Sequence, residues 1–403
     1  MKILIVTQYF PPEIGAAATR WSEYSKILQN NGHDVTILTE LPNYPSGIIA
    51  EGYPKYWFHE DTQIKNLPRV IRVPIWANPR RTTIQRLGFY VSFMMNATLR
   101  ALFLPRYDYI VVSSPPLFVG LIATLIRPFK RAKYVLDLRD IWPESAIVLG
   151  EINSKIMSSI GKYVERLVYK SVDSFFLAVP GFVQYLETYH SSHLRKKKIN
   201  LMNGVSESFL ELINSERNIP KAKKFTVLFS GNIGLAQGLE TIIEVARLLA
   251  QEDVLFKIIG DGSKRDEIVS QLKILGLSNV SIFPSMSRNQ LVREILTSHI
   301  CLVPLIKSPL FLNAIPSKML EYMAAGKPVI VSIMGEVETI IKNAECGQIV
   351  EPENSADMVE SIMGYLRNPD RLIFEGKKGI QFVKHNFLKE DLIFDAFEEL
   401  ERE

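Results

Sequence analysis

Short β-branched runs alternate with longer amphipathic segments along the whole chain, and this alternation limits the possible folds more than any other feature of the sequence. In the first half, runs expected to form strands occupy residues 2–6, 34–39, 70–73, 109–113, 133–137 and 174–178. Segments with helical periodicity, such as 17–31 and 117–126, lie between them. Alternating strands and helices form mostly parallel sheets with helices on both faces, and near-apolar central strands suit such covered sheets. We therefore expect an α/β fold with a doubly wound parallel sheet.

The alternation starts again after a polar, lysine-rich stretch at residues 214–224. The second series of expected strands occupies residues 226–230, 255–260, 280–283, 299–304, 328–332 and 348–350. A chain of 403 residues is also too long for one ordinary core, since domains have about 100–200 residues. We therefore predict two domains, the first over residues 1–205 and the second beginning at 206.

Composition and charge exclude several classes of protein. Hydrophobic residues make up 47% of the chain and charged residues 22%, which is typical of a folded protein. Cys301 and Cys346 lack metal-ligand spacing, so we expect a reducing compartment, no disulfide framework and no zinc site. The formal charge of +4 offers no case for nucleic acid binding. The N-terminal run is too short for a secretory signal, and a cytoplasmic protein is expected.

The segment from Asn313 to Pro328 predicts a binding site for a nucleotide sugar. A loop leads into a helix that carries Ser317, Lys318 and Glu321, and a Gly-Lys-Pro turn follows before the next strand. Glu321 stands one helical turn past Ser317 and Lys318, where its carboxylate can accept two hydrogen bonds from the cis-diol of a ribose. The amides of the helix start, together with Lys318, would face the anionic oxygens of a diphosphate.

Two turns earlier in the second half belong to the same prediction. A strand ends at a glycine-rich turn that contains Gly231, Asn232 and Gln237 before the next helix. Backbone amides and a positive helix end at such a turn suit phosphate oxygens. The next strand closes with Gly260 and Asp261, an Asp-Gly turn that is a weak signal by itself.

Two loops of the first half lie where ligands bind in open α/β sheets, beyond the carboxyl ends of the strands. After the first strand, Gly15 and Ala16 precede a helix, and such small residues let a ligand approach the backbone. After a later strand, Asp137, Arg139 and Asp140 gather charge at the strand end. Arg139 either pairs with Asp137 or turns toward a ligand.

Together these motifs resemble the retaining GT-B glycosyltransferases of family 4, and most closely the bacterial L-fucosaminyl transferase branch. The resemblance extends over almost the whole chain. Besides the donor motifs, it rests on the segments Tyr9-Phe-Pro-Pro-Glu13, Pro42-Asn-Tyr-Pro-Ser-Gly47, Ser113-Ser-Pro-Pro116, Asp140-Ile-Trp-Pro-Glu144 and Asn203-Gly-Val205. It implies two Rossmann-like domains facing an interdomain cleft, with residues 206–380 as the donor domain and 381–403 packing back on the first domain.

The chain departs from the family pattern in three motifs. Asn313 stands where the first glutamate of the E-x7-E pattern is found, and Arg139 stands where a histidine is common. Asn232 and Gln237 replace an arginine and a lysine, and Lys318 is the expected compensation.

The resemblance assigns roles to the candidate residues. Glu321 would hold the ribose, Asn313 would contact sugar hydroxyls, and Arg139 or Asp140 would assist catalysis. Gly231, Asn232, Gln237, Ser317 and Lys318 would meet the diphosphate, Gly15 and Ala16 would reach the diphosphate and acceptor, and Gly260 with Asp261 would border the base. The donor would be a nucleoside diphosphate sugar, with neither cofactor nor metal ion.

The predicted activity is transfer of a sugar, such as an N-acetylated 6-deoxyhexosamine from UDP, with retention onto a lipid-linked, undecaprenyl-type or polysaccharide acceptor of a surface glycan. Two alternatives remain open. One is a sugar-nucleotide 2-epimerase of similar architecture, and the other is a catalytically silent partner subunit suggested by the lost charges.

Residues 84–104 form a mostly apolar segment with one polar stripe. The stripe contains Gln85, Arg86, Ser92, Asn96 and Arg100. The segment is too polar on one side to span lipid, but it could lie against an anionic membrane surface. In that prediction the face with Phe89, Phe93 and Leu104 enters the lipid, while Arg81, Arg86 and Arg100 meet headgroups. The alternative is a helix packed within the first domain.

Overall fold

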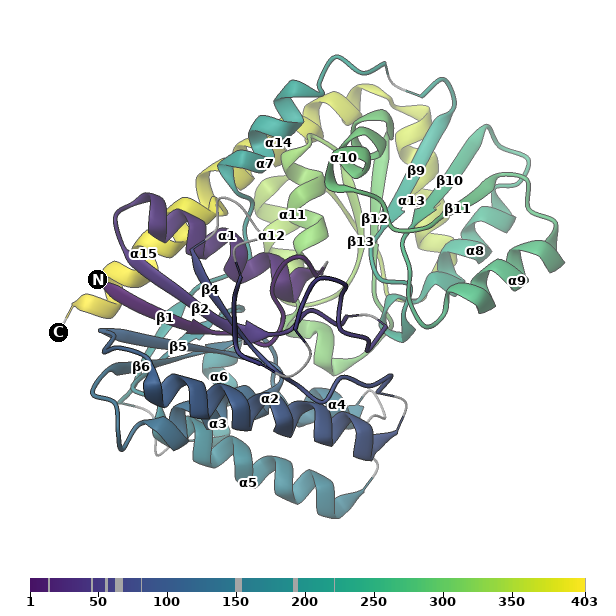
Figure 1. Cartoon of the computed structure of the whole chain (residues 1–403). Helices are drawn as coiled ribbons and strands as arrows, with labels where there is room; N and C mark the ends of the chain where they lie inside the picture. Colours follow the sequence, from purple (N-terminus) through teal and green to yellow (C-terminus); the bar gives the residue numbers. More distant parts are fainter. Residues whose placement is uncertain are drawn as a thin grey trace. The chain divides into compact units, whose positions relative to one another are not determined.

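The computed structural model describes residues 1–13, 15–44, 46–54, 57–61, 68–80, 82–148, 154–190, 195–220 and 222–402. The chain divides into two compact units (Figure 1). The first unit comprises residues 1–202 and 390–403, and the second comprises 203–389. The sequence predicts these boundaries at 205/206 and 380/381.

Eight strands form the sheet of the first unit within its described residues, in the order β3-β4-β2-β1-β5-β6-β7-β8. They are β1 (Lys2–Val6), β2 (Asp34–Glu40), β3 (His59–Asp61), β4 (Arg69–Val73), β5 (Tyr109–Ser114), β6 (Lys133–Leu138), β7 (Ser174–Leu177) and β8 (Lys197–Asn200). All neighbouring pairs are parallel except β3 and β4. The central strands β1 and β5 are almost wholly buried, as expected for a sheet covered on both faces.

Helices cover both faces of this sheet. They are α1 (Ala16–Asn30), α2 (Thr83–Phe103), α3 (Leu117–Ile126), α4 (Glu144–Val148), α5 (Lys155–Ser171), α6 (Phe182–Tyr189) and α15 (Lys389–Glu401). Figure 1 shows α2, α3 and α5 on one side of β1, β5 and β6, with α1 and α15 on the other. On the α15 side, Phe397 lies 6.0 Å from the ring of Tyr109 and 5.6 Å from that of Phe176. These aromatic contacts attach the C-terminal helix to the first unit.

The second unit contains a six-stranded parallel sheet in its described part, in the order β11-β10-β9-β12-β13-β14. The strands are β9 (Phe225–Ser230), β10 (Val254–Ile259), β11 (Val280–Phe283), β12 (Ile300–Pro304), β13 (Val329–Ser332) and β14 (Gly347–Ile349). Both series of expected strands are confirmed, although β3 and β8 of the first unit have no counterpart among the predictions.

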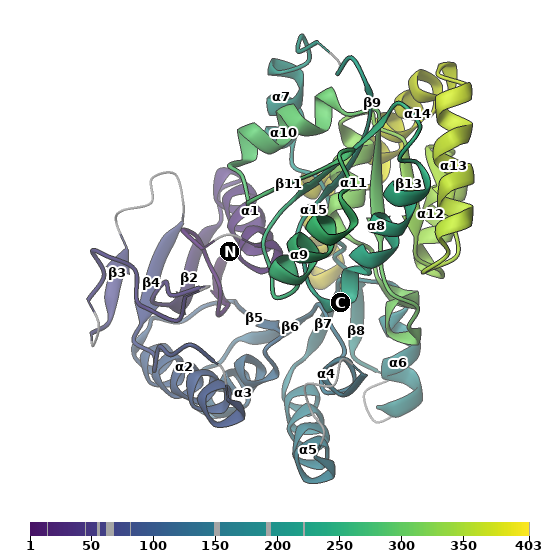
Figure 2. The ribbon, with the colours of Figure 1, turned by 90° about the vertical axis from the view of Figure 1, so that its right-hand side faces the viewer.

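The helical elements of the second unit are α7 (Glu207–Ser215), η2 (Leu235–Gln237), α8 (Leu239–Leu248), α9 (Arg265–Leu275), α10 (Arg288–Thr297), η3 (Pro309–Asn313), α11 (Ser317–Ala324), α12 (Glu336–Ala344), α13 (Ser355–Arg367) and α14 (Asp370–Asn386). Buried side chains of α8, α9 and α13 form one core with β9 and β10. Figure 2 shows α8 and α9 side by side. Strand order changes direction between β9 and β12, and such a switch point is where ligands bind in doubly wound sheets.

Candidate active site

The turns that follow β9 and β10 touch through their backbones. A Cβ atom on Gly260 would lie 1.8 Å from the carbonyl oxygen of Gly231, and the two residues have φ angles of 152° and 136°. Both conditions require glycine. The backbone NH of Gly231 donates to Ile259, and that of Ile233 donates to Asp261. These two amides are therefore used inside the protein, whereas no described residue accepts a bond from the amide of Asn232 or Gly234.

Lys318 lies beside the first of these glycines. Its Nζ atom is 4.1 Å from the ring centre of Phe229, and a Cβ atom on Gly231 would come within 2.8 Å of it. Burial lowers the pKa of Lys318 to about 7, although the carboxylate of Glu321 acts in the opposite direction. A desolvated ammonium group at a helix start next to a glycine turn is well suited to meet an anion.

Glu321 follows one turn later on α11, and its carboxylate pairs with Arg288. The Oε1 atom lies 3.4 Å from Nη2 of Arg288, and the side chain of Glu321 is 25% exposed. The guanidinium of Arg288 also lies over the ring of Phe209, 4.5 Å from its centre. The sequence prediction did not include Arg288. The sequence signal for Arg288 was only its position: a basic residue in the first turn of a helix is unfavourable beside the positive end of the helix dipole, which can indicate another role.

The remaining donor-site candidates occupy the same end of the second sheet. Asn313 ends η3, and Ser317 begins α11. A Cβ atom on Gly234 would lie 2.6 Å from Nδ2 of Asn232 and 3.4 Å from Oε1 of Gln237. Oε1 of Gln237 is buried and has no partner among the described residues. Asn232 and Gln237, the two neutral residues in place of the expected arginine and lysine, therefore lie together at the turn that contains Gly234.

Asp261 holds two loops together. Its Oδ2 atom accepts a 2.8 Å hydrogen bond from the backbone NH of Ser285, and its Oδ1 atom lies 3.3 Å from Arg265. The hydrogen bond from Ser285 lowers the pKa of Asp261. This arrangement leads from the end of β10 to the loop before α10, where Arg288 begins.

In the first unit, the carboxylate of Asp137 is a buried hydrogen-bond centre. It receives bonds from Arg20, Trp21 and Ser113, with an Arg20 Nη2 to Oδ1 distance of 2.7 Å. Both side chains of the Arg20–Asp137 pair are at most 1% exposed. Arg139 is a more distant neighbour, with its Nε atom 4.0 Å from Asp137. Arg20 is therefore the principal partner of Asp137, which the sequence prediction missed because the two residues are far apart in the chain.

Arg139 and Asp140 line a cavity of about 290 Å³ at the carboxyl ends of β5 and β6. Nη2 of Arg139 donates to the carbonyl of Pro115, and burial lowers the pKa of Arg139. The other lining residues are mostly aromatic or small: Tyr9, Ala17, Tyr90, Pro115, Pro116, Leu117, Phe118, Trp142, Ser145 and Ala146. Gly15 caps α1, which begins at Ala16, so the predicted small-residue turn leads directly to the cavity wall at Ala17.

Glu13 joins two of the sequence motifs. Its Oε1 atom accepts 2.9 Å bonds from the backbone NH groups of Asn43 and Tyr44. Burial raises the pKa of Glu13, although these bonds oppose the shift. The ring of Tyr44 in turn lies 5.9 Å from that of Tyr9. Tyr9 and Glu13 thus form one loop cluster with Asn43 and Tyr44, a relationship that their separate positions in the sequence do not reveal.

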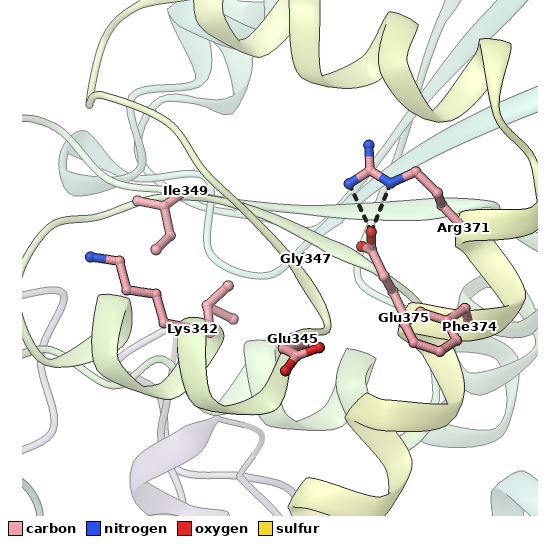
Figure 3. Close-up of a pocket in the computed structure, with 8 residues that line it drawn as sticks. Lys342, Glu345, Gly347, Ile349, Arg371, Phe374 and Glu375 are labelled. Atoms are coloured by element: carbon pink, nitrogen blue, oxygen red, sulfur yellow. Dashed lines mark hydrogen bonds and ion pairs between the residues drawn. The ribbon is translucent and has the colours of Figure 1, made fainter.

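Another pocket lies away from these residues, beside the edge strand β14 (Figure 3). It has a volume of about 500 Å³, and its lining includes Lys342, Glu345, Phe374 and the ion pair of Arg371 with Glu375. The pocket runs along β14, from Gly347 to Ile349, and is lined by the end of α12, which leads into the amino end of that strand. By the rule for doubly wound sheets it is the weaker candidate for a donor site.

Two family models match the chain, one in each unit. The model described as "Glycosyl transferase 4-like domain" matches residues 15–197, and the model described as "Glycosyl transferases group 1" matches residues 213–378. The chain is built from the two domains of a family 4 glycosyltransferase. The resemblance to this family is thereby confirmed, whereas the fucosaminyl branch and retention stay predictions.

Individual relatives agree with this assignment. The chain is 25% identical over 394 residues to the "Putative colanic acid biosynthesis glycosyl transferase WcaI" of Escherichia coli K12, covering 92% of this chain and 93% of the relative. Among solved structures, a sucrose-phosphate synthase from Thermosynechococcus elongatus has a TM-score of 0.73 at 18% identity, covering 98% and 97% of the two chains. Anabaena HepE in complex with UDP and glucose has a TM-score of 0.69 at 15% identity, with 99% of each chain covered. These likenesses confirm the GT-B fold.

Helix α2 presents a different face from the one expected. Phe89 and Phe93 are fully buried and Leu104 is nearly so, which contradicts their assignment to a lipid-facing surface. Two residues of the polar stripe bond inward, whereas Arg86 of the same stripe is exposed: Ser92 accepts a bond from the NH of Trp76, and Asn96 donates to the carbonyl of Pro74. The outward face consists of apolar side chains that are 45–81% exposed: Ile84, Leu87, Met95, Leu99 and Phe103. We call these five residues the α2 apolar stripe.

Other expectations bear on metals and membranes. Among the described residues, no group of three or more His, Cys, Asp or Glu side chains is arranged to hold a metal ion. Within the same part of the chain, no helix combines the length and apolar character needed to cross a bilayer. Cys301 and Cys346 are free and buried. Arg81, expected at headgroups, lies outside the described residues.

Proposed function

We propose that this glycosyltransferase moves an N-acetylated 6-deoxyhexosamine, such as L-FucNAc, from UDP onto a lipid-linked glycan acceptor with retention. One observation supports a nucleotide donor most directly: Lys318 and Glu321 lie one turn apart on α11, with Lys318 against Gly231 at the switch point of the sheet. The ammonium group suits the diphosphate, and the carboxylate suits the ribose diol. The relatives favour a surface glycan and UDP, since one is named for colanic acid biosynthesis and HepE binds UDP.

The proposed reaction needs no covalent intermediate with the protein. An acceptor hydroxyl oxygen forms a bond to the anomeric carbon on the face from which UDP departs, as the bond between that carbon and the diphosphate oxygen breaks. The hydroxyl proton passes to the leaving diphosphate, so the products are the extended glycan and UDP. Lys318 and the amides of Asn232 and Gly234 would stabilise the charge that grows on the diphosphate, which is usually the largest catalytic contribution.

We further propose that the protein works on the cytoplasmic surface of a membrane without spanning it. The α2 apolar stripe is the supporting observation, because contiguous exposed apolar surface marks a site of interaction. Helix α2 contains no acidic residue, and Arg86, Arg100 and Arg106 lie on it or just beyond it. Anionic headgroups complement such a surface.

A transfer assay tests the proposal. The full-length protein is incubated with a panel of UDP-, GDP-, ADP- and TDP-sugars and a prenyl diphosphate-linked monosaccharide in anionic vesicles, and products are identified by mass spectrometry. We expect transfer from UDP-linked N-acetylated 6-deoxyhexosamine, with an anomeric configuration by NMR that matches the donor. Donor alone serves as the control. Isomerised donor would support the epimerase alternative, and tight UDP binding without transfer would support the silent subunit.

A further inference from the structure

Strand β9 parts from its neighbour β12 before it reaches the glycine-rich turn. It pairs with β10 along its whole length, whereas among the described residues its register with β12 covers Val227 and Leu228. Backbone groups of a strand point alternately to its two edges. The NH of Gly231 donates to Ile259 on the β10 side, so the NH of Ser230 points to the β12 side. Because this amide is buried beyond the end of the pairing with β12, it needs a partner from outside the sheet.

Tyr322 on α11 supplies that partner. Its hydroxyl accepts a 2.8 Å hydrogen bond from the NH of Ser230 and lies 2.8 Å from Oγ of the same residue. The Tyr322 side chain is fully buried, and burial raises its pKa, so the phenol stays neutral and keeps its hydrogen. The tyrosine thus ties α11 to the last residue of β9, at the switch point of the sheet.

Lys318 contacts the same short segment from the same face of α11. It precedes Tyr322 by four residues, and side chains with this spacing lie on one side of a helix. The Nζ atom of Lys318 lies 4.1 Å from the ring centre of Phe229, and a Cβ atom on Gly231 would come within 2.8 Å of it. Two side chains of one helix face therefore contact three consecutive residues at the end of β9.

Glu321 belongs to another face of the same helix. It is adjacent to Tyr322 and therefore lies about 100° away around the helix axis. Its carboxylate pairs there with Arg288. The bond between Tyr322 and Ser230 thus connects the helix that carries both donor-site charges directly to the turn whose amides would meet the diphosphate.

We propose that Tyr322 is a positioning residue of the sugar transfer. Its hydroxyl holds the turn after β9 at the distance from α11 at which Lys318 and the amides of Asn232 and Gly234 meet the same diphosphate. This inference rests on the proposed function and goes beyond it, since Tyr322 is buried and acts through other groups. Donors that are already in place stabilise the charge that grows on a leaving diphosphate without rearrangement. Without the hydroxyl, the buried NH of Ser230 loses its partner, and the end of β9 shifts to find another.

Tyr322→Phe tests the inference, because it removes the hydroxyl and keeps the ring. In the full-length protein we expect kcat for transfer from the UDP-sugar to fall by about tenfold or more, while KM for the donor changes by less than about threefold, since the growing charge is met only in the transition state. Tyr365→Phe is the matched control. Tyr365 is another fully buried tyrosine of the second unit, and its hydroxyl donates to Glu375 on α14, outside the candidate site. Its replacement should lower the melting temperature but leave kcat unchanged.

Proton uptake on UDP binding is a second readout, which a merely structural role would not change. In the unmodified protein, burial lowers the pKa of Lys318 to about 7, against the effect of Glu321. UDP binding at pH 8 should therefore take up close to one proton. In Tyr322→Phe the shifted turn lets water reach the ammonium, and the pKa of Lys318 rises. The free protein is then already charged, so uptake should fall to about half a proton or less, whereas Tyr365→Phe should keep it. Calorimetry in two buffers with different ionisation enthalpies provides the measurement.

The outcomes distinguish this inference from the proposed function. Unchanged kcat or unchanged proton uptake in a folded Tyr322→Phe protein would overturn the inference and leave the transferase function standing. If the unmodified protein binds UDP but transfers no sugar, the proposed function fails, and the proton uptake of the two variants decides the inference. If Tyr322→Phe does not fold, 3-fluorotyrosine at position 322 replaces it, because this residue keeps the hydroxyl as a weaker acceptor. It should lower kcat by a smaller factor, and an unchanged kcat would again overturn the inference.

Discussion

Glu321 on α11 and Arg288 on α10 form an ion pair within the second unit, with 3.4 Å between Oε1 of the carboxylate and Nη2 of the guanidinium. Both side chains are partly exposed, at 25% for Glu321 and 40% for Arg288. Pairs in such a setting contribute at most about 1 kcal/mol. The hydroxyl groups of a ribose can therefore compete with Arg288 for the carboxylate.

Replacing Glu321 by Gln tests the ribose assignment. The substitution keeps the shape but removes charge-assisted bonds, so we expect the free energy of UDP binding to weaken by about 1.5–3 kcal/mol, at least tenfold in Kd. Isothermal titration calorimetry provides the measurement. With 2′-deoxy-UDP as ligand, the difference in binding free energy between the variant and the unmodified protein should be smaller, because this ligand lacks one of the hydroxyl groups that the carboxylate would bind.

The matched controls for that experiment are Glu360→Gln and Arg288→Gln. Glu360 is exposed on α13, so its replacement should leave the Kd for UDP unchanged. Arg288→Gln removes only the competitor of the ribose and should change the Kd less than threefold. An unaltered UDP affinity in Glu321→Gln would refute the contact with ribose.

The lowered pKa of Lys318 predicts that the protein takes up a proton when the donor binds. Its pKa of about 7 means that most free protein carries a neutral Lys318 at pH 8. A bound diphosphate favours the charged form and raises this pKa, so UDP binding at pH 8 should take up close to one proton. As pH rises above 7, UDP affinity should fall by up to about tenfold per pH unit. Calorimetry at pH 8 in two buffers with different ionisation enthalpies measures the uptake directly.

Lys318→Met should abolish that proton uptake and weaken UDP binding most at low pH, where the lysine of the unmodified protein is charged. Lys273→Met is the control, because Lys273 is exposed near the end of α9. Proton uptake that persists in Lys318→Met would assign the titration to another group.

Asp137→Asn should destabilise the first unit strongly. The substitution leaves Arg20 buried with its charge uncompensated, and breaking a buried pair in this way costs about 3–5 kcal/mol of unfolding free energy. Urea denaturation followed by circular dichroism provides the measurement. Glu60→Gln breaks the exposed pair with Arg69 and should cost at most about 1 kcal/mol. Equal losses of unfolding free energy in the two variants would contradict a special contribution of Asp137 to the stability of the first unit.

Membrane binding should depend on the α2 apolar stripe and not on the buried face. Replacing Met95, Leu99 and Phe103 by Gln should greatly reduce flotation with anionic vesicles, because these side chains are exposed apolar surface. Replacing Arg86 and Arg100 by Gln should weaken association by about 1 kcal/mol per charge. Salt should have a similar effect, since attraction is screened beyond about 8 Å at physiological ionic strength.

The buried face supplies the contrast in this experiment. Phe89→Gln should lower the melting temperature of the protein, because Phe89 is fully buried. UDP binding should survive in the stripe variants, whose residues lie in the first unit. If the unmodified protein does not float with vesicles, the stripe does not bind membranes.

The order of strands and helices, and the positions of the turns that carry candidate residues, follow from the sequence. Runs such as 2–6 and 226–230 are short, apolar and bounded by polar or turn residues, as expected of buried strands, and glycines such as Gly231 and Gly260 mark turns where no side chain fits. These are local properties, because periodicity and backbone sterics act over a few residues. Residue chemistry at one helix start identified Lys318 and Glu321, and the family motifs agreed with that assignment.

Tertiary structure alone decided which side chains meet and which faces are covered. Arg20 reaches Asp137 across 117 positions of the chain, and Arg288 approaches Glu321 from another helix. For α2, periodicity identified two faces but not which one points outward. The carbonyl of Pro74 and the NH of Trp76 need partners, so Asn96 and Ser92 turn inward and apolar residues face solvent. Contacts between distant segments set this outcome, and no local pattern in the sequence records them.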